Sequence, residues 1–414
     1  MGLKNKSVLV IGFNTRPLVY SLNRAGYHVY SVDFFGDIDL YPYVEDALIL
    51  TKQLNSSYDL LKEGYAKFIP KLTFKLLEKY PTIDYYIIGS GLDDHFNERK
   101  LILNKIQNEK SSIYNLNNDF EVLQRARNLK YLYDFLKEFD YKVPLTYPLQ
   151  HNEREITYPI ILKKSKSSGG LNIIKIKSEE ELALTLKILK SNEFNPSDWM
   201  FQEFIDGIPV SCTVISNGKE SIVLSINRQI IGEKFVNSPK EFMYCGNIVP
   251  ANLLEKDCTL IEEISLLLAN KLNLKGINGF DYVLKEHYPY LMEINPRIPG
   301  SIRVSEDALN LNLMDLHVKS FNNKYWEEIK TIGRSLEFNN FSTKLIYFAP
   351  KLISREIVMK INALKFIHDK SDPESLIQKN TPVCSILYKD KTFSASYFGA
   401  LKISNEIHQI ISNG

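Results

Sequence analysis

Residues 279–297 carry oxygen-bearing side chains at a spacing that suits a metal ion. Two short apolar runs, 282–284 and 290–294, predict adjacent antiparallel strands joined by a polar turn. Glu293 and Asn295 lie two residues apart, so on a strand they share a face, and a hairpin can bring Asp281 beside them. Two carboxylates and one amide suit Mg²⁺, which is commonly shared with nucleotide phosphates. Arg297 adds a guanidinium for a phosphate or an acyl phosphate.

The same pattern has a purely structural interpretation. Acidic residues are common at strand ends, and Asn295-Pro296 is an ordinary turn signal. From the spacing alone, the metal site and the structural turn therefore stay open as alternatives.

The segment 279–297 resembles the metal-binding end of the ATP-grasp superfamily, and four upstream segments resemble other parts of that superfamily in the same order. Lys130 follows Arg127-Asn128-Leu129 and opens a predicted helix, and the run 158–163 ends in Lys163. Residues 165–170 resemble the glycine-rich loop over the phosphates, and residues 201–207 resemble the hinge strand that contacts adenine. An acidic residue for the ribose is not evident in residues 207–211.

The resemblance implies ATP and Mg²⁺, or Mn²⁺, as cofactors, with the metal held by Asp281, Glu293 and Asn295. It also implies which residues bind ATP: Lys130, Lys163, Ser167, Ser168, Gly169, Gly170, Gln202, Glu203, Phe204 and Ile205.

Within the superfamily, four further segments resemble a group of predicted ATP-dependent carboligases, or carboxylate-amine ligases, related to biotin carboxylase: 12–16, 33–37, 227–232 and 244–250. The resemblance implies ligation of a small carboxylate to an amine, or to a thiol, through an acyl phosphate. Arg297, Asn295 and Arg228 are the expected catalytic residues. Two alternatives remain: an ATP-dependent carboxylase or phosphoryl transferase, and a protein that binds ATP without chemistry.

The first 90 residues predict a strand-helix-strand unit, with strands at 7–12 and 28–32 and a third strand at 85–88. Asp33 after the second strand suggests dinucleotide binding, but no second glycine follows Gly12, so the fingerprint fails. Arg16, near the helix start, is a candidate for holding an acceptor's carboxylate or phosphate, or a surface residue. Ser90 and Gly91 are candidates for substrate contact, or a plain turn.

The pattern and the resemblance together predict an α/β (α+β) protein with an ATP-grasp fold, in three parts. Residues 1–117 are expected to form a Rossmann-like preATP-grasp domain. Residues 118–335 are expected to form the ATP-grasp domain, with a lid at about 145–206 and a helical stretch at 118–140. Residues 336–414 are expected to form a small β-rich lobe.

Composition narrows the class of partner. The 414 residues include 51 basic and 49 acidic side chains, so the net charge of +2 gives no electrostatic case for nucleic acid. The sequence contains no apolar run of about 18 residues, so it predicts no membrane span. Four scattered cysteines favour reduced thiols in a cytoplasmic protein. Related enzymes are often dimers, so a homodimer is one candidate state.

Overall fold

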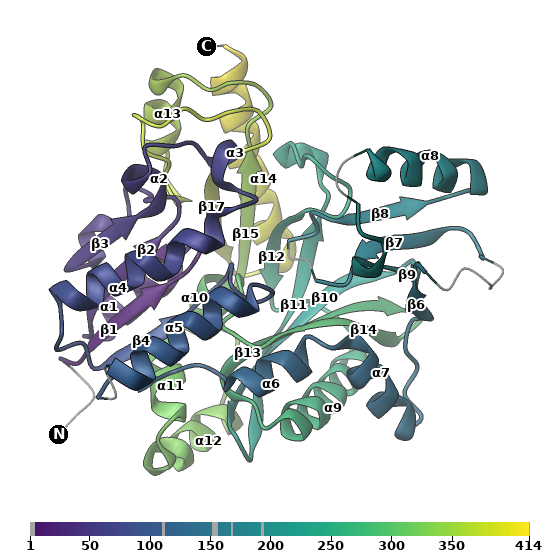
Figure 1. Cartoon of the computed structure of the whole chain (residues 1–414), viewed down its shortest axis with the longest axis horizontal. Coiled ribbons are helices and arrows are strands. Elements are labelled where there is room, and N and C mark those ends of the chain that lie inside the picture. Colours follow the sequence, from purple (N-terminus) through teal and green to yellow (C-terminus); the bar gives the residue numbers. More distant parts are fainter. Residues whose placement is uncertain (1–4, 110–111, 151–155, 167–168, 192–193, 414) are drawn as a thin grey trace.

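Three β-sheets organise the chain. The computed structural model describes residues 5–109, 112–150, 156–166, 169–191 and 194–413. A five-stranded sheet holds the N-terminal part, a four-stranded sheet holds the lid, and an eight-stranded sheet runs through the remainder (Figure 1). The mixed α/β fold that the sequence predicts is confirmed.

The N-terminal sheet is parallel, with strand order β3-β2-β1-β4-β5. The apolar runs form strands here because both faces are covered by helices, so every position except the first of β1 is buried. The strands and the principal helices are β1 (Ser7–Ile11), α1 (Arg16–Arg24), β2 (His28–Asp33), β3 (Asp46–Ile49), α4 (Ile69–Lys79), β4 (Tyr85–Ile88), α5 (Phe96–Glu109) and β5 (Tyr114–Asn115). Short helices α2 (Leu50–Gln53) and α3 (Tyr58–Leu61) follow β3. The predicted strand-helix-strand opening and third strand are confirmed.

The lid sheet is antiparallel, with order β6-β9-β7-β8. Its elements are β6 (Thr146–Pro148), β7 (Ile160–Lys164), β8 (Ile173–Ile176), α8 (Glu179–Lys190) and β9 (Trp199–Glu203). A small core of its own, centred on Leu162 and Phe201, packs the sheet together with α8. Because β9 ends at Glu203 and β10 starts the central sheet at Ile208, residues 204–207 link the two sheets.

The central sheet has the order β14-β13-β10-β11-β12-β15-β17-β16, with antiparallel neighbours. Its strands are β10 (Ile208–Asn217), β11 (Ser221–Ile231), β12 (Tyr244–Val249), β13 (Lys275–Lys285), β14 (Tyr288–Asn295), β15 (Phe341–Phe348), β16 (Ile367–His368) and β17 (Pro382–Asp390). Residues 336–414, expected as a separate lobe, add three strands to this sheet, while the division into domains stays a prediction.

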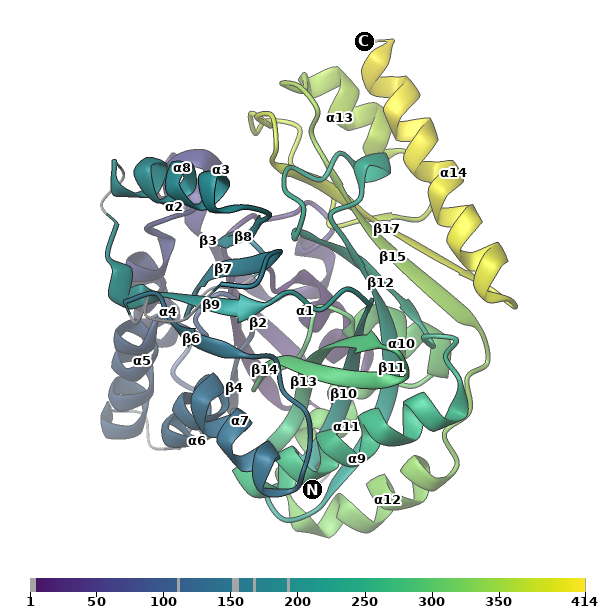
Figure 2. The ribbon, with the colours of Figure 1, turned by 90° about the vertical axis from the view of Figure 1, so that its right-hand side faces the viewer.

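Helices line the central sheet from several parts of the chain (Figure 2). Its associated helices are α6 (Phe120–Ala126), α7 (Leu129–Glu138), α9 (Glu255–Leu272), α10 (Ile302–Leu309), α11 (Leu313–Ser320), α12 (Trp326–Arg334), α13 (Arg355–Asn362) and α14 (Phe393–Ser412). One core joins α6, α7 and α9 to the strands around Phe280, and a second joins α13 and α14 to β15 and β17. No helix of the described residues is long and apolar enough to cross a membrane. All four cysteines are free thiols.

His317 connects the central sheet to the N-terminal part. Its Nδ1 atom accepts a hydrogen bond from the backbone N–H of Ile277 at 2.9 Å, and Nε2 lies 3.1 Å from the carbonyl of Leu116. Complete burial lowers the pKa of this imidazole to about 4, so it is neutral in the folded protein at pH 7.

The lowered pKa of His317 predicts a loss of stability in mild acid. Between pH 6.5 and 4, His317 takes up a proton in the unfolded chain but stays neutral in the folded protein. This difference lowers the free energy of unfolding by about 3 kcal/mol by pH 4. We expect the thermal midpoint of the wild type to fall over this range more steeply than that of His317→Asn. His28→Asn, a change at an exposed histidine, is the control and should follow the wild type. Parallel pH profiles for wild type and His317→Asn would contradict the assignment.

Candidate functional site

The predicted metal hairpin is present and its register is as the chemistry requires. Asp281 on β13 pairs directly with Glu293 on β14, and Gly279 pairs with Asn295. A two-residue turn, Glu286-His287, closes the hairpin with φ angles of 49° and 65°, as a primed turn needs. A bulge beside Asp281 increases the local twist. The Asn295 Nδ2 atom donates to Asp281 at 2.8 Å and lies 3.4 Å from Glu293 Oε1.

The two carboxylates form an electrostatically strained pair. Burial raises the pKa of Asp281 well above its usual range, and the neighbouring charge of Glu293 raises it further. Gln229 on β11 donates to the second oxygen of Asp281 at 2.9 Å. A divalent cation would relieve this repulsion, and hard oxygen donors are what Mg²⁺ prefers, so the residues fit that ion. The described residues hold no group of three His, Cys, Asp or Glu side chains suited to a metal, so an ion at this hairpin would need Asn295 as its third protein ligand.

Lys163 of the lid faces the same carboxylates. It stands near the end of β7, opposite Met200 of β9. Burial lowers the pKa of its ammonium to about 8; Glu293 opposes that effect, whereas Arg127 adds to it. The lysine that the sequence predicted as a phosphate ligand therefore lies within electrostatic reach of Glu293.

Arg127, rather than Lys130, extends into the site. The predicted helix 118–140 is broken into α6 and α7, since the side chain of Asn128 accepts from the N–H of Tyr131 and caps α7. Arg127, in that break, is paired with Asp94 at 2.7 Å and with Glu293 at 3.3 Å, and its side chain is 5% exposed. Lys130 lies three residues further along the chain, on the outer face of α7. Its side chain is 85% exposed and is paired with Asp134. The position of Lys130 near a helix start did not indicate whether Lys130 or Arg127 points into the site.

Arg297 joins the hairpin to the N-terminal domain. Its Nε atom donates to Asp93 Oδ2 at 2.7 Å, and a second nitrogen donates to the carbonyl of Ile298 at 3.0 Å. The charge of Asp93 raises the pKa of this guanidinium against the opposing effect of burial. Arg99 of α5 is fully buried nearby and lowers the pKa of Asp93, although Arg297 does so more strongly. Asp93 follows the predicted contact residues Ser90 and Gly91, whose own roles stay predictions.

Arg228 lies on the other face of its strand. It stacks over the ring of Phe393 at 6.0 Å, while its neighbours Asn227 and Gln229 point to the face that holds Asp281. The structure therefore does not bring Arg228 together with the other predicted catalytic residues. The alternation of side chains along β11 gives the reason, because a change of one residue exchanges the two faces.

Of the predicted hinge residues 202–205, some are buried and others are exposed. Gln202 is buried and donates to Tyr133 at 3.0 Å and to Thr146 at 3.1 Å, so its amide supports the lid from within. Glu203 is exposed and accepts from the N–H of Leu145. The ring of Phe204 lies under the ammonium of Lys175, 3.6 Å from its centroid, and Ile205 is buried.

The glycine-rich loop contacts the central sheet across the gap between the lid and β12. The carbonyl of Gly169 accepts from the N–H of Tyr244 at 3.4 Å, and Lys240 donates to the carbonyl of Leu171 at 2.6 Å. A Cβ on Gly170 would lie 1.8 Å from the carbonyl oxygen of Phe242, which explains the glycine there. Ser167 and Ser168, predicted to bind phosphate, lie outside the described residues.

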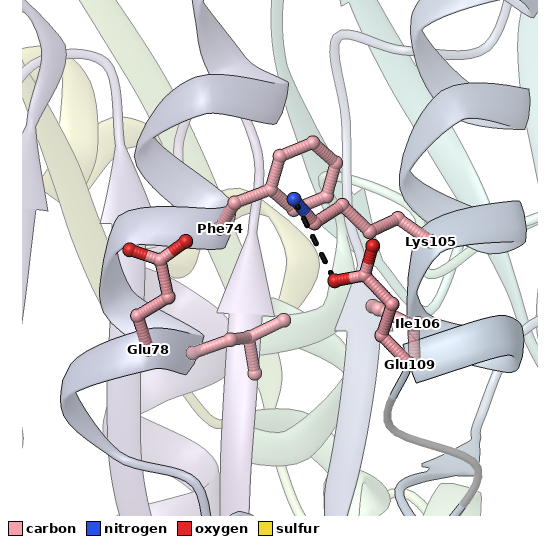
Figure 3. A pocket seen from close by; sticks show the side chains of 6 residues that line it. Phe74, Glu78, Lys105, Ile106 and Glu109 are labelled. Carbon is pink, nitrogen blue, oxygen red and sulfur yellow. Dashed lines mark ion pairs between the residues drawn. The ribbon is translucent and has the colours of Figure 1, made fainter.

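A small hollow lies away from these residues, between α4 and α5 (Figure 3). Lys105 stands in it with its ammonium 4.5 Å from the Phe74 ring centroid and 3.6 Å from Glu109. It shares no side chain with the hairpin site and carries no chemistry of its own.

Comparisons with known proteins identify the class. Residues 127–301 match the family model of the ATP-grasp domain. The chain is 28% identical over 393 residues to an uncharacterized protein of Methanocaldococcus jannaschii, a match that covers 93% of this chain and 89% of that protein. A D-alanine–D-alanine ligase of Christiangramia forsetii is 25% identical over 187 residues, which span 43% of this chain and 56% of the ligase.

Solved structures share the fold over nearly the whole chain. An L-amino acid ligase from Bacillus licheniformis superposes with a TM-score of 0.68 at 15% identity, covering 98% of both chains. N5-carboxyaminoimidazole synthase from Aspergillus clavatus gives 0.70 at 14% identity, covering 97% of this chain and 99% of the other. Residues 127–301 of the chain are thus an ATP-grasp domain, as its motifs predict.

The loop contact predicts a difference between two neighbouring glycines. Both have positive φ, 66° for Gly169 and 78° for Gly170, so alanine strains both equally. Only at Gly170 would the new methyl group also meet backbone, because nothing lies within 4 Å of a Cβ at Gly169. We expect Gly170→Ala to weaken magnesium-ATP binding at least tenfold by calorimetry, and Gly169→Ala less than threefold. Equal losses would show that the contact with Phe242 is irrelevant.

The positions of Arg127 and Lys130 predict a large effect on nucleotide binding for the first residue and almost none for the second. Charge-assisted hydrogen bonds contribute about 1.5–3 kcal/mol, so Arg127→Met should weaken magnesium-ATP at least tenfold. Lys130→Met should change the Kd less than twofold, because its side chain lies on the outer face of α7. A larger loss for Lys130→Met than for Arg127→Met would restore the prediction from sequence.

Proposed function

We propose that the protein is an ATP- and magnesium-dependent carboxylate-amine ligase that forms an acyl phosphate and releases ADP and phosphate. The observation that carries the proposal is the partly buried Asp281/Glu293 pair with Lys163, Arg127 and Arg297 around it. A charge arrangement of this kind suits a nucleotide polyphosphate with its cation, and it comes from three separate parts of the chain. The ATP-grasp domain supplies the class, mostly ligases and carboxylases.

The reaction needs activation of the carboxylate. An amine and a carboxylate form a salt in water, because the oxyanion is a poor leaving group. Transfer of the γ-phosphoryl group to the carboxylate oxygen turns that oxygen into part of a phosphate leaving group. The protein's share of the work is then positioning and neutralisation of charge.

Each basic residue has a separate part in this scheme. Lys163, on the lid strand, holds phosphate oxygens, and Arg127 holds phosphate from the opposite side while keeping Glu293 in place. Asp281, Glu293 and Asn295 would hold Mg²⁺, which supplies charge neutralisation on the phosphates. Arg297, fixed by Asp93, faces the transferred group and the tetrahedral intermediate.

The glycine-rich loop excludes water. Its contacts with Tyr244 and Lys240 close one side of the gap between the lid and the central sheet. An acyl phosphate hydrolyses readily, so exclusion of water directs it to the amine.

The test is mass spectrometry of a cytosolic metabolite pool incubated with the protein and magnesium-ATP, with Glu293→Gln as the control. We expect ADP together with a new mass equal to an acid plus an amine minus water, absent with Glu293→Gln. That variant keeps the shape of the side chain but removes one charge from the metal pair. Arg297→Lys should slow the reaction at least tenfold, because it keeps the charge and loses the fork.

Other products would point to other functions. ADP with a carboxylated or phosphorylated product alone would favour a carboxylase or a phosphoryl transferase. Binding of ATP without turnover in any pool would favour a nucleotide-binding protein without chemistry.

A further inference from the structure

A second group of buried charges lies where the N-terminal domain meets β15 and β16. We call Arg16, Asp37, Asp39, Lys344 and Asp369 the junction cluster. Arg16 begins α1, Asp37 and Asp39 follow β2, Lys344 is on β15, and Asp369 follows β16. The exposed fractions of Arg16, Asp37, Lys344 and Asp369 are 3%, 8%, 6% and 9%. The first part of the chain and the last part thus build one polar region.

The cluster is only partly paired. Arg16 contacts Asp39 at 2.7 Å and the Nδ1 atom of His368 at 2.8 Å, but its Nε atom lies 3.9 Å from Asp369 Oδ1. That Oδ1 atom is buried without a hydrogen-bond partner among the described residues. Within the same described ranges, the Asp37 carboxyl takes part in no hydrogen bond or ion pair. Lys344 reaches only the carbonyl of Gly300, at 3.4 Å.

The charges do not balance. Among the five residues of the junction cluster, three carboxylates face two cations, and His368 is neutral at pH 7 because burial and the adjacent Arg16 lower its pKa to about 4. Arg303 and Lys370 also lie within electrostatic reach, but Arg303 is paired with Glu306 and Asp307, and Lys370 donates to the carbonyl of Asn362. Lys344 and Arg16 hold the pKa of Asp369 below its ordinary value. Burial, Asp369 and the other nearby carboxylates raise the pKa of Asp37 well above its ordinary value. A buried carboxylate without a partner is costly, so Asp37 on its own favours the neutral form, and its ionised form lacks one cationic partner.

A row of polar side chains connects the cluster with the hairpin site. Lys344 pairs with Asn247 across β12 and β15, and Asn247 pairs with Gln229, which donates to Asp281. Tyr244 hydrogen-bonds Asn247, and both Asp281 and Asp369 raise the pKa of its hydroxyl. Lys344 also touches Gly300, three residues after Arg297. The cluster therefore forms one end of the polar face that carries the predicted metal ligands.

We propose that the junction cluster binds an ammonium group of one substrate between Asp37 and Asp369. A primary ammonium ion brings one positive charge and three donors, which match the missing charge and the two carboxyl groups that lack full partners. The identity of this ligand as a substrate rests on the proposed ligase function, whereas its binding does not.

The bound ammonium is a recognition group and not the reacting nitrogen. Four strand-to-strand steps separate β13, which carries Asp281, from β15, which carries Lys344, or about 19 Å across the sheet. The reacting end of the substrate would lie toward Arg297, along the row of Asn247 and Gln229. A substrate with an ammonium group at one end and its reacting group at the other fits this distance.

The experiment is calorimetric titration of the full chain with single compounds, each beside its N-acetyl derivative: lysine, ornithine, glutamate, β-alanine and putrescine. Potassium chloride is titrated in parallel, since a metal cation would satisfy the same carboxylates. Asp37→Asn removes the charge with little change of shape. Asp59→Asn, which breaks a surface ion pair with Lys62, is the matched control. Magnesium-ATP affinity, measured on every variant, reports on folding of the nucleotide site.

We expect at least one amine to bind, with its acetylated form at least tenfold weaker. Asp37→Asn should lose that binding at least tenfold and keep the Kd for magnesium-ATP within twofold, while Asp59→Asn should match the wild type. Lys344→Met changes a buried residue of the cluster but leaves both carboxylates in place, so it should retain ammonium binding. Its retention would show that the loss in Asp37→Asn comes from the missing carboxylate and not from disruption of the cluster.

Three results would overturn the inference: no amine binds, the acetylated compound binds equally well, or potassium alone gives the Asp37-dependent signal. A condensation product made from acetylated substrates, and unaffected by Asp37→Asn, would also reject it while leaving the ligase intact. If an amine binds in an Asp37-dependent way but no condensed product forms, the proposed ligase function is rejected and the proposed ammonium site is supported.

Discussion

Repulsion between Asp281 and Glu293 is the constraint on which the arrangement of the site depends. Cross-strand pairing fixes the two carboxyl groups side by side, and burial makes the charge of Asp281 more costly than it would be in water. Such a pair is tolerable only if cations surround it. Arg127 supplies one directly, and the amides of Gln229 and Asn295 donate to the oxygens that remain.

The cations come from three separate segments of the chain. Lys163 belongs to the lid, Arg127 to the break between two helices, and Arg297 to the segment after the hairpin. Asp93 of the N-terminal part then holds Arg297, so the hairpin site is tied to the part of the chain that contributes three of the five junction-cluster residues. Relative movement of the lid or the N-terminal domain would change the charge around the carboxylates at once.

The same logic relates the two polar regions of the central sheet. Each contains a carboxyl group whose pKa burial and a neighbouring carboxylate raise well above its ordinary value, and each takes residues from segments distant in sequence. Between them lies a row of neutral polar groups on β11 and β12, which solvates a ligand without adding charge. A molecule bridging both regions would meet opposite requirements at its ends, phosphate and metal at one and an ammonium group at the other.

The sequence by itself determined the positions of β1, β2 and β4, the hairpin that pairs Asp281 with Glu293, and the ATP-grasp domain, because these depend on local apolar patterns and on motifs of fixed spacing. The tertiary structure alone decided which side chains turn inward. Arg127 and Lys130 lie three residues apart, and a cap at Asn128 sends one into the site and the other to the surface. Arg228 and Gln229 are adjacent, and the pleat assigns them to opposite faces. Likewise, Arg16 showed its basic charge in sequence, but its partners His368 and Asp369 became visible only when chain segments more than 300 residues apart packed together. A local pattern records which residues are polar, whereas register and long-range packing decide what they contact.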